Sequence, residues 1–561
     1  MGGIGQVQEA AARSTSQEST GQVAEKTTPV QERVVHGNEA FNEALLREPP
    51  RAWAPSMVMV YLFSVVGFLC STMNGYDASL INNLLQNRDF RDTYDVGADG
   101  LGAGLVAAMY QIGGVAVLPF VGPVIDRFGR RAGMGAGAAL VIVGTIVQGT
   151  AAGGGGGGAR AFMGGRFLLG FGVGLAASAG PMYVVEINHP AYRGVVGAVY
   201  NCLWLAGAIL AAGAARGSLA VSAAFSWRLI TWLQCLFSGV VVLLCPFVPE
   251  SPRWLYVNGR RGRARARAFL VRYHGAGDPD SVWPALQMRE YEEALDLDGA
   301  DKRWYDYGAL FRDRASAYRL VCSVSVAALS QWLGNAVLSY FLGSVLYNAG
   351  FTEPIQQSNI TLANNVIQFV CACCGAVLVD RVGRRPLLIF SFAACTVVWL
   401  GMTIASSQFA ASYAGESADH VPIYTNANAS RASLAMIFLF GAVFSIGITP
   451  LQGLYIVEVL SFEQRAKGMA FGNLAVNAAG LLNQFAWPVS MAKIGWRTYI
   501  IFIIWDAIMT VYMYFILPET KGRTLEELDE IFAAKNPVKA SVAKKKLAIT
   551  QQGQVVDIAE A

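Results

Sequence analysis

Long apolar runs alternate with short polar connections along most of the chain from residue 56 onward. A run of roughly 20 apolar residues is long enough to cross the hydrocarbon core of a bilayer as a helix. The pattern predicts an all-α membrane protein with twelve spans in two groups of six. The predicted spans are residues 56–80, 101–125, 133–152, 161–185, 195–216 and 227–249, then 317–342, 361–379, 386–407, 433–457, 468–490 and 498–517.

The polar segments between and around these runs predict the domain organisation. We expect a disordered cytosolic tail over 1–55, six-helix bundles over 56–249 and 317–517, a cytosolic central loop with short helices over 250–316, and a cytosolic C-terminal tail over 518–561. Basic clusters lie between even and odd spans, and excess Lys and Arg mark cytosolic loops. Both termini are therefore predicted to be cytosolic, and the polar N-terminus shows no signal peptide.

Composition agrees with a membrane location. Of 561 residues, 54% are hydrophobic and only 15% are charged, whereas soluble proteins carry about 25% charged residues. The net charge of +4 is small and the basic residues lie in short clusters between apolar runs, which argues against a nucleic-acid partner. The bilayer is the expected partner, and two sequons, at Asn359 and Asn428, fall in loops predicted to lie outside, where they are candidate glycosylation sites.

Several chemistries are not supported by the sequence. The hexaglycine run at 153–158 lacks the Lys-Ser/Thr of a phosphate loop. The nine cysteines fall in predicted spans without interleaved His or carboxylate ligands, so neither a metal nor a cofactor is predicted. The run RGRARAR beginning at Arg261 could be a nuclear-localisation patch, but a solvated cytosolic loop is favoured. No nucleophile, base and oxyanion-stabilising group come together, so an enzyme is not expected.

The two halves of the chain repeat each other. DRFGRR begins at Asp126 and DRVGRR at Asp380; in both halves a glutamate precedes an arginine by seven residues; PESPRW closes the first half and PETKGR the second. Duplicated membrane bundles are typical of transporters, because two similar bundles can rock about a site between them.

These motifs, together with PMYVVEINHPAYRG, resemble the sugar porter family of the major facilitator superfamily over residues 56 to 530. Three stretches, YNCLWLAG, QWLGNAVLSYF and TPLQGLYIVEVLSFEQRAKGMA, are similar to its fungal lactose permease and cellodextrin transporter branch. The resemblance implies the major facilitator fold, with transport of a sugar by alternating access.

Asp77 lies at the end of the charge-free first run. It could cap a helix end at the headgroups, but the following residues ASLINNLL could also continue the helix and place Asp77 within the outer half of the span. An ionised carboxylate there costs at least ~2.5 kcal/mol and needs a partner or an aqueous cavity. Arg166, at matching depth in the fourth span, is the predicted counter-charge. In proton symporters of the family the resemblance implies this pairing, with Asn common in passive facilitators.

Sugar hydroxyls need amides and aromatic faces within a cleft, and amides recur at helical spacing. Asn201 occupies the position where the resemblance implies a sugar-binding Gln. Gln331 and Asn335 are four residues apart and are expected to share a helix face. A stacking Trp of the family is replaced by Gly453, next to Gln452, which favours a bulkier ligand such as a disaccharide. The predicted substrate-binding residues are Asn201, Gln331, Asn335, Gln452 and Asn477.

The repeated loop motifs predict a cytosolic gate of ion pairs that forms and breaks as the bundles rock, although the arginines could instead only fix topology. Its predicted members are Asp126, Arg127, Arg130, Arg131, Glu186, Arg193, Asp380, Arg381, Arg384, Arg385, Glu458 and Arg465. The sequence therefore predicts a monomeric, proton-coupled symporter that imports a disaccharide or hexose across the plasma membrane, with sugar and proton as its ligands. A passive facilitator, a nutrient sensor and a metabolite exporter of the same fold remain alternatives.

Overall fold

The computed structural model describes most of the chain as helix. The described residues are 44–96, 100–151, 156–221, 223–300, 310–416, 422–460, 465–521, 523, 525–542, 545–549 and 555–560. Residues 36–542 form one compact unit. A separate unit comprises residues 1–35 and 543–561, in which the described strands β3 (Lys545–Ile549) and β4 (Val555–Glu560) pair antiparallel.

All six spans predicted for the first bundle lie on helices of the structure. They are α3 (Pro55–Gln86), α5 (Gly100–Ala116) with α6 (Leu118–Phe128), α7 (Arg130–Thr150), α8 (Gly156–Ile187), α9 (Arg193–Ser218), and α10 (Ala223–Trp232) with α11 (Gln234–Leu244). The second span bends by 47° between α5 and α6. Pro119 and Pro123 follow the bend, and a proline within a helix removes a backbone hydrogen bond.

The second bundle follows the same order. Its helices are α15 (Arg314–Leu329), the turn η3 (Ser330–Trp332) and α16 (Asn335–Tyr340), then α17 (Leu342–Asn348), α18 (Pro354–Val382), α19 (Arg384–Ala411), α20 (Ala427–Val459), α21 (Arg465–Ile494), η4 (Gly495–Arg497) and α22 (Thr498–Ile516). The strands β1 (Tyr413–Glu416) and β2 (Pro422–Tyr424) form an antiparallel hairpin between α19 and α20.

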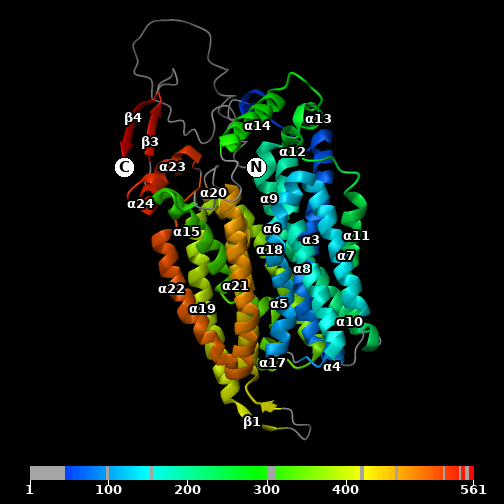
Figure 1. The fold of residues 1–561 in the computed structure, drawn as a ribbon. Helices are drawn as coiled ribbons and strands as arrows, with labels where there is room; N and C mark the ends of the chain where they lie inside the picture. Colours follow the sequence, from blue (N-terminus) through cyan, green and yellow to red (C-terminus); the bar gives the residue numbers. More distant parts are fainter. Residues whose placement is uncertain are drawn as a thin grey trace. The chain divides into compact units, whose positions relative to one another are not determined.

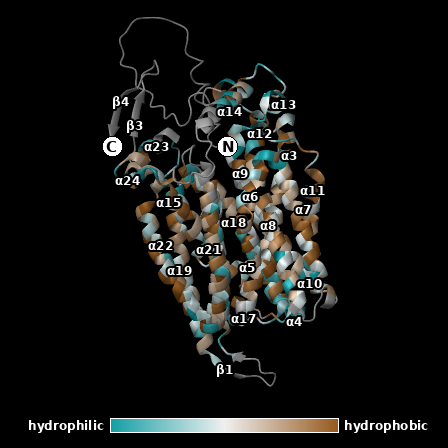
Figure 2. Ribbon diagram, in the orientation of Figure 1, coloured by the Kyte–Doolittle hydropathy of each residue, from teal (hydrophilic) through white to brown (hydrophobic). Residues whose placement is uncertain are grey.

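Shorter helices mark the two ends of the bundles (Figure 1). We call the end with α12 (Pro252–Val257), α13 (Gly259–Tyr273), α14 (Val282–Ala300), α23 (Leu525–Ala533) and α24 (Pro537–Val542) the inner end. The opposite, outer end carries α4 (Arg88–Tyr94), α17 and the β1–β2 hairpin. The short turn η1 (Pro190–Tyr192) connects α8 to α9. Hydrophilic residues gather at the inner end, whereas brown apolar residues cover the long helices between the ends (Figure 2).

Helix length and apolarity support most of the predicted spans individually. Among the described residues, nine helices are long and apolar enough to cross a membrane, or ten when the bent pair counts as one span. One of these, Phe471–Ile516, contains the last two predicted spans together. The seventh predicted span, 317–342, is missing from that set because it is divided between α15, η3 and α16.

Part of the predicted N-terminal tail contacts the central segment. Glu48 accepts hydrogen bonds from the Ser281 hydroxyl at 2.6 Å and, through its backbone carbonyl, from Trp283 Nε1 at 2.9 Å. Glu48 therefore lies against the start of α14, while residues 1–43 lie outside the described residues.

The long helices of the first bundle pack closely where glycine replaces a side chain. A Cβ atom at Gly75 of α3 would overlap the backbone carbonyl of Trp204 on α9, and one at Gly207 of α9 would overlap the backbone of Thr72. Such small residues let helix backbones approach each other within a membrane. The two bundles meet along two seams, where α5 packs against α21 and α9 packs against α18.

The α3–α9 contact predicts a position-specific stability effect. Gly75→Ala should lower the thermal stability of the detergent-solubilised protein, because overpacking a tight contact costs about 1–3 kcal/mol. Gly213→Ala on α9 is the matched control, since a Cβ there meets nothing within 4 Å. Melting followed by fluorescence-detected size-exclusion chromatography measures both variants. Equal melting temperatures for the two variants would contradict the packing account.

Candidate functional site

Asp77 and Arg166 lie side by side in the interior of the first bundle. The α3 helix continues without a break to Gln86, so Asp77 lies within the span, and both residues are buried, with exposures of 0% and 1%. Arg166 Nη1 donates to the backbone carbonyl of Asp77 at 3.3 Å. Neither carboxylate oxygen of Asp77 has a hydrogen-bond partner among the described residues. The structure thus brings Asp77 and Arg166 together as predicted, but the hydrogen bond between them is accepted by the Asp77 main-chain carbonyl and not by its carboxylate.

Aromatic residues complete the surroundings of this pair. The Arg166 guanidinium lies over the ring of Tyr110 on α5, 5.2 Å from the ring centroid. The Tyr110 hydroxyl donates to Asn74 Oδ1 at 2.9 Å. Tyr340, on α16 of the second bundle, lies near Arg166 and near Gln111 of α5. The charged pair therefore lies close to the boundary between the bundles.

Two predicted substrate positions, on the fifth and tenth spans, face each other across that boundary. A Cβ atom at Gly453 of α20 would lie 3.3 Å from Nδ2 of Asn201 on α9. Gln452, which precedes Gly453 on α20, is partly buried. The Asn201 amide therefore approaches the α20 backbone closely at Gly453, where a side chain would meet it.

Asn477 lies at the other seam. Its Oδ1 is 3.4 Å from the position of a Cβ on Gly114 of α5, and a Cβ on Gly480 would lie 3.4 Å from the Gln111 side chain. Gln111 was missed by the sequence reasoning, although it is a lone amide within an apolar run. It is a further candidate for a hydroxyl-binding group between α5 and α21.

Gln331 and Asn335 do not share a helix face, which corrects the expectation from their spacing. The helix ends at Leu329, Gln331 belongs to the turn η3, and Asn335 begins a new helix after Gly334, whose φ of 93° is in the left-handed region. The backbone carbonyl of Gln331 accepts a hydrogen bond from Asn483 at 2.8 Å. Broken helices with unwound backbone are typical of transporter binding sites. Gln331 and Asn335 therefore stay candidate substrate-binding residues because they flank this break, and not because they share a helix face.

A hollow lies between the two bundles beside Trp204. Its lining comes from α3, α9, α16, α17 and α18, and consists of Ser79, Asn82, Asn83, Trp204, Ala208, Leu338, Ser339, Leu342, Thr361, Asn365 and Gln368. About 20 Å³ of it is open to the centre of a water molecule, which is room for about one water. The sequence reasoning missed the α3 residues of this lining, because the polar end of the first run was read for its charge alone.

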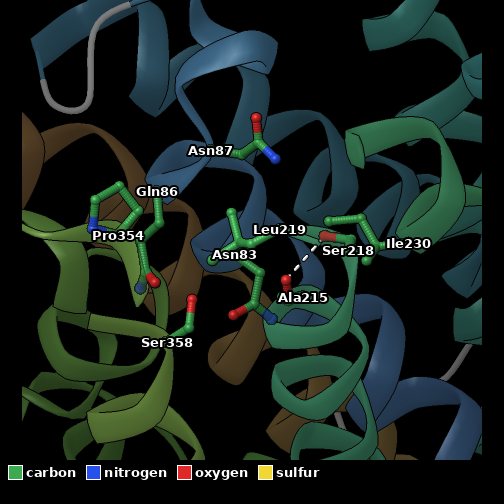
Figure 3. Close-up of a pocket in the computed structure, with 9 residues that line it drawn as sticks. All are labelled: Asn83, Gln86, Asn87, Ala215, Ser218, Leu219, Ile230, Pro354 and Ser358. Atoms are coloured by element: carbon green, nitrogen blue, oxygen red, sulfur yellow. Dashed lines mark hydrogen bonds between the residues drawn. The ribbon is translucent and has the colours of Figure 1, made fainter. Parts of the chain in front are cut away.

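A second hollow continues toward the outer end and shares Asn83 with the first (Figure 3). It is lined by Asn83, Gln86, Asn87, Ala215, Ser218, Leu219, Ile230, Pro354 and Ser358. Asn83 Oδ1 and Gln86 Oε1 are buried without a hydrogen-bond partner among the described residues. The two hollows together follow α3 from mid-span to its outer end.

Three hydrogen bonds between described residues cross from the first bundle to α18. Gln86 Nε2 donates to Thr361 Oγ1 at 3.4 Å, Arg216 Nε donates to Asn359 Oδ1 at 3.0 Å, and Asn365 Nδ2 donates to the Ala208 carbonyl at 3.1 Å. They lie between the outer end and mid-span.

Both predicted glycosylation sites are exposed. Asn359 lies early in α18, and Asn428 lies in the first turn of α20.

The predicted gate residues form an ion pair in each half at the inner end. Arg130 Nε lies 2.9 Å from Glu186 Oε2, and Arg384 Nη2 lies 2.8 Å from Glu458 Oε1. Each of these pairs stays within its own bundle. Asp126 lies 3.4 Å from Arg130 at an exposed position.

The remaining gate residues bind backbone carbonyls or lie at the surface. Arg131, Arg193 and Arg385 donate to the carbonyls of Val248, Asn188 and Tyr514. Arg127 and Arg381 are exposed. The side chains of Asp380 and Arg465 lie outside the described residues.

Two glutamates from the closing motifs were missed as site residues. Glu250 of PESPRW accepts from the backbone N–H groups of Arg130 and Arg131, and Glu519 of PETKGR accepts from those of Arg384 and Arg385. Burial raises the pKa of Glu250, which these N–H donors partly offset. Each glutamate caps the helix that begins with the paired arginine.

No group of three or more His, Cys, Asp or Glu side chains in the described part of the chain is arranged to hold a metal ion.

Comparisons with known proteins agree with this architecture. The family model described as sugar (and other) transporter matches residues 63–532. The high-affinity glucose transporter of Kluyveromyces lactis is 28% identical over 499 residues, covering 86% of this chain and 87% of the relative. The MFS-type transporter oryC of Aspergillus oryzae is 25% identical over 470 residues, covering 82% and 83%.

Solved structures show the same fold. The partially occluded inward-open conformation of the xylose transporter XylE from E. coli superposes with a TM-score of 0.67 at 20% identity, covering 83% of this chain and 99% of that chain. The proton:xylose symporter XylE bound to 6-bromo-6-deoxy-D-glucose gives a TM-score of 0.67 at 20% identity, covering 84% and 99%. The fold is the major facilitator fold, and the protein is a multi-pass membrane transporter, not an enzyme. By the match of its family model over most of its length, the chain belongs to the sugar (and other) transporter family.

Proposed function

We propose that this protein imports a sugar together with a proton across the plasma membrane, as a monomer with both termini in the cytosol. The observation that carries the proposal is the Asp77 carboxylate, fully buried within a span and without a hydrogen-bond partner among the described residues. Burying an ionised group in a membrane is costly, and such residues commonly belong to proton or ion pathways.

Proton binding at Asp77 changes the balance of forces on Arg166. When the carboxylate is ionised it attracts the guanidinium, and when a proton neutralises it Arg166 keeps only the Asp77 main-chain bond and the Tyr110 face. Tyr340 of α16 lies near Arg166, so this change would be felt at the boundary with the second bundle. A proton can therefore bias the equilibrium between conformations, provided that it binds one of them more tightly.

The sugar would bind between the bundles, where the hollow that now has room for about one water would widen as the bundles move apart. Amides and hydroxyls from α3, α16 and α18 line it next to Trp204, and Asn201 lies at the same boundary, against Gly453 of α20. Polar groups with an aromatic face suit a polyhydroxylated ligand. Glycine at position 453, in place of the family's stacking Trp, supports a disaccharide over a hexose. Relatives named as glucose transporters and the xylose-transporting neighbour support a sugar.

Alternating access would require the outer hydrogen bonds to α18 to break. Breaking them would open the two hollows to the outside, while the inner ion pairs, each within one bundle, would move with their bundle as rigid caps. A passive facilitator is the second candidate, because a relative from Equus caballus, 24% identical over 435 residues, is named a facilitated glucose transporter.

Asp77→Asn separates these two candidates. The variant should lose uphill sugar accumulation and sugar-driven proton entry, while sugar still equilibrates across the membrane, because the amide cannot bind and release the proton. Uptake of labelled sugar and pH recording in transport-deficient yeast measure both quantities. Asp506→Asn is the matched control: Asp506 of α22 is equally buried and also without a partner among the described residues. Undiminished accumulation in Asp77→Asn would refute proton coupling at this site.

Gly453→Trp tests whether the residue at position 453, beside Asn201, sets the size of the ligand. The indole should exclude a disaccharide and raise its KM by at least about tenfold, while monosaccharide uptake persists. Kinetics with cellobiose, lactose and glucose make the comparison, and Gly164→Trp on α8, where a Cβ would meet nothing within 4 Å, controls for expression. A uniform loss for all sugars would show that position 453 does not determine ligand size.

Thr361→Ala tests the outer closure. Losing the bond from Gln86 should raise the outward-open population about two- to tenfold, since a hydrogen bond contributes about 0.5–1.5 kcal/mol. The readout is labelling of Ser79→Cys, in the first hollow, by a membrane-impermeant maleimide added outside. Thr150→Ala is the control, because the Thr150 hydroxyl bonds within its own helix α7. Unchanged labelling would mean that this bond does not hold the outer side closed.

A further inference from the structure

Helix α13 carries a dense set of basic residues. Arg260, Arg261, Arg263, Arg265, Arg267 and Arg272 are all exposed, and the sequence from residue 251 to 277 contains no acidic residue. The opposite side of the helix is buried through Gly262, Ala266, Phe269 and Leu270. The helix is therefore docked on the protein by a narrow apolar strip, with its arginines directed away.

The arginines form two rows, one on each side of the buried strip. At 3.6 residues per turn, Arg260, Arg263 and Arg267 follow one flank, and Arg261, Arg265 and Arg272 follow the other. Residues three or four apart are neighbours on a helix surface, and like charges at that spacing repel. Each row therefore raises the electrostatic free energy of the folded helix.

This repulsion is not relieved within the described protein. No described carboxylate forms an ion pair with these six arginines. Two of them lie over aromatic rings: Arg263 over Tyr256 at 4.8 Å and Arg272 over Tyr273 at 5.4 Å. Those contacts hold the side chains in place but leave their charge uncompensated, so an external anion would stabilise both rows.

The helix lies next to the membrane-spanning region. The Tyr273 ring meets the ring of Phe63 edge to face at 5.6 Å, and Phe63 belongs to α3, the first span. Helix α12, just before α13, begins only eight residues after the sixth span ends at Leu244. The C-terminal end of α13 is thus held beside the first turns of the first span, where a bilayer surface would meet the inner end.

We propose that α13 binds anionic phospholipid headgroups of the adjacent leaflet through its two arginine rows. Polybasic segments beside a membrane span are attracted to anionic lipids, and guanidinium groups suit phosphate geometry. The fixed position of α13 beside a span favours lipid over a soluble anion. This binding does not depend on the transported substrate, and it explains the basic run better than topology alone, because orientation needs charge but not two ordered rows.

The test uses native mass spectrometry of the full-length protein in detergent, titrated with phosphatidylserine or phosphatidylcholine. The wild type should retain phosphatidylserine preferentially. Replacing either row by glutamine, as Arg260→Gln with Arg263→Gln and Arg267→Gln or as the equivalent triple at 261, 265 and 272, should weaken phosphatidylserine binding by about tenfold or more. Triple replacement of the same residues by lysine should restore most of it.

The matched control removes three exposed charges elsewhere at the inner end: Arg312→Gln, Lys535→Gln and Lys539→Gln. This variant should bind phosphatidylserine like the wild type. An equal loss in the control would mean that net charge alone attracts the lipid, and would overturn the proposal. Retained binding in both row variants would also overturn it, as would selective binding of soluble inositol hexakisphosphate without a preference for phosphatidylserine.

Discussion

The cost of placing charge in an apolar medium governs this structure. Backbone groups satisfy one another within helices, so the sequence can be apolar for most of its length. Ionisable side chains are then confined to places where they are compensated or useful. The pairs Arg130–Glu186 and Arg384–Glu458 lie at helix ends, where each glutamate also accepts from a neighbouring hydroxyl, Ser251 or Thr520. Within the spans, charge is an exception that requires a separate explanation.

The two halves of the molecule share the contacts at their inner ends but differ in the buried charged residues within their spans. Their inner ends repeat one arrangement, in which a closing-motif glutamate caps the helix that carries the paired arginine. No comparable repetition exists at mid-membrane among the described residues. The first bundle places Asp77 next to Arg166, whereas the second has Asp506, with Cys395 nearby and no hydrogen-bond partner for its carboxylate in the described part. Duplication therefore accounts for the rocking scaffold, and later divergence for the site.

The sequence predicted the helices well because their signals are local. Apolar length located the spans, and repeated motifs located the inner pairs. Prediction from the sequence failed where the position of a side chain depends on the backbone path or on neighbouring helices. Spacing alone suggested a shared face for Gln331 and Asn335, but the left-handed conformation at Gly334 separates them. Asn365 lines the hollow, whereas its neighbour Asn364 faces Gly441 of α20, and no helix-periodicity argument distinguishes the two without knowing which side meets α9.

Helix α3 would connect the two binding events that the proposed symport must couple. Asp77 faces Arg166 on α8, while Ser79 and Asn83, less than two turns further along, face the hollow toward α9 and α18. Because Gly75 holds the α3 backbone against α9, a small change in the pull on Asp77 cannot be absorbed by a loose contact there. It must instead appear as a displacement of the polar outer part of α3, where Gln86 bonds to Thr361 of the other bundle. One rigid helix thus places the charge, the lining of the hollow and the outer contact under a common constraint.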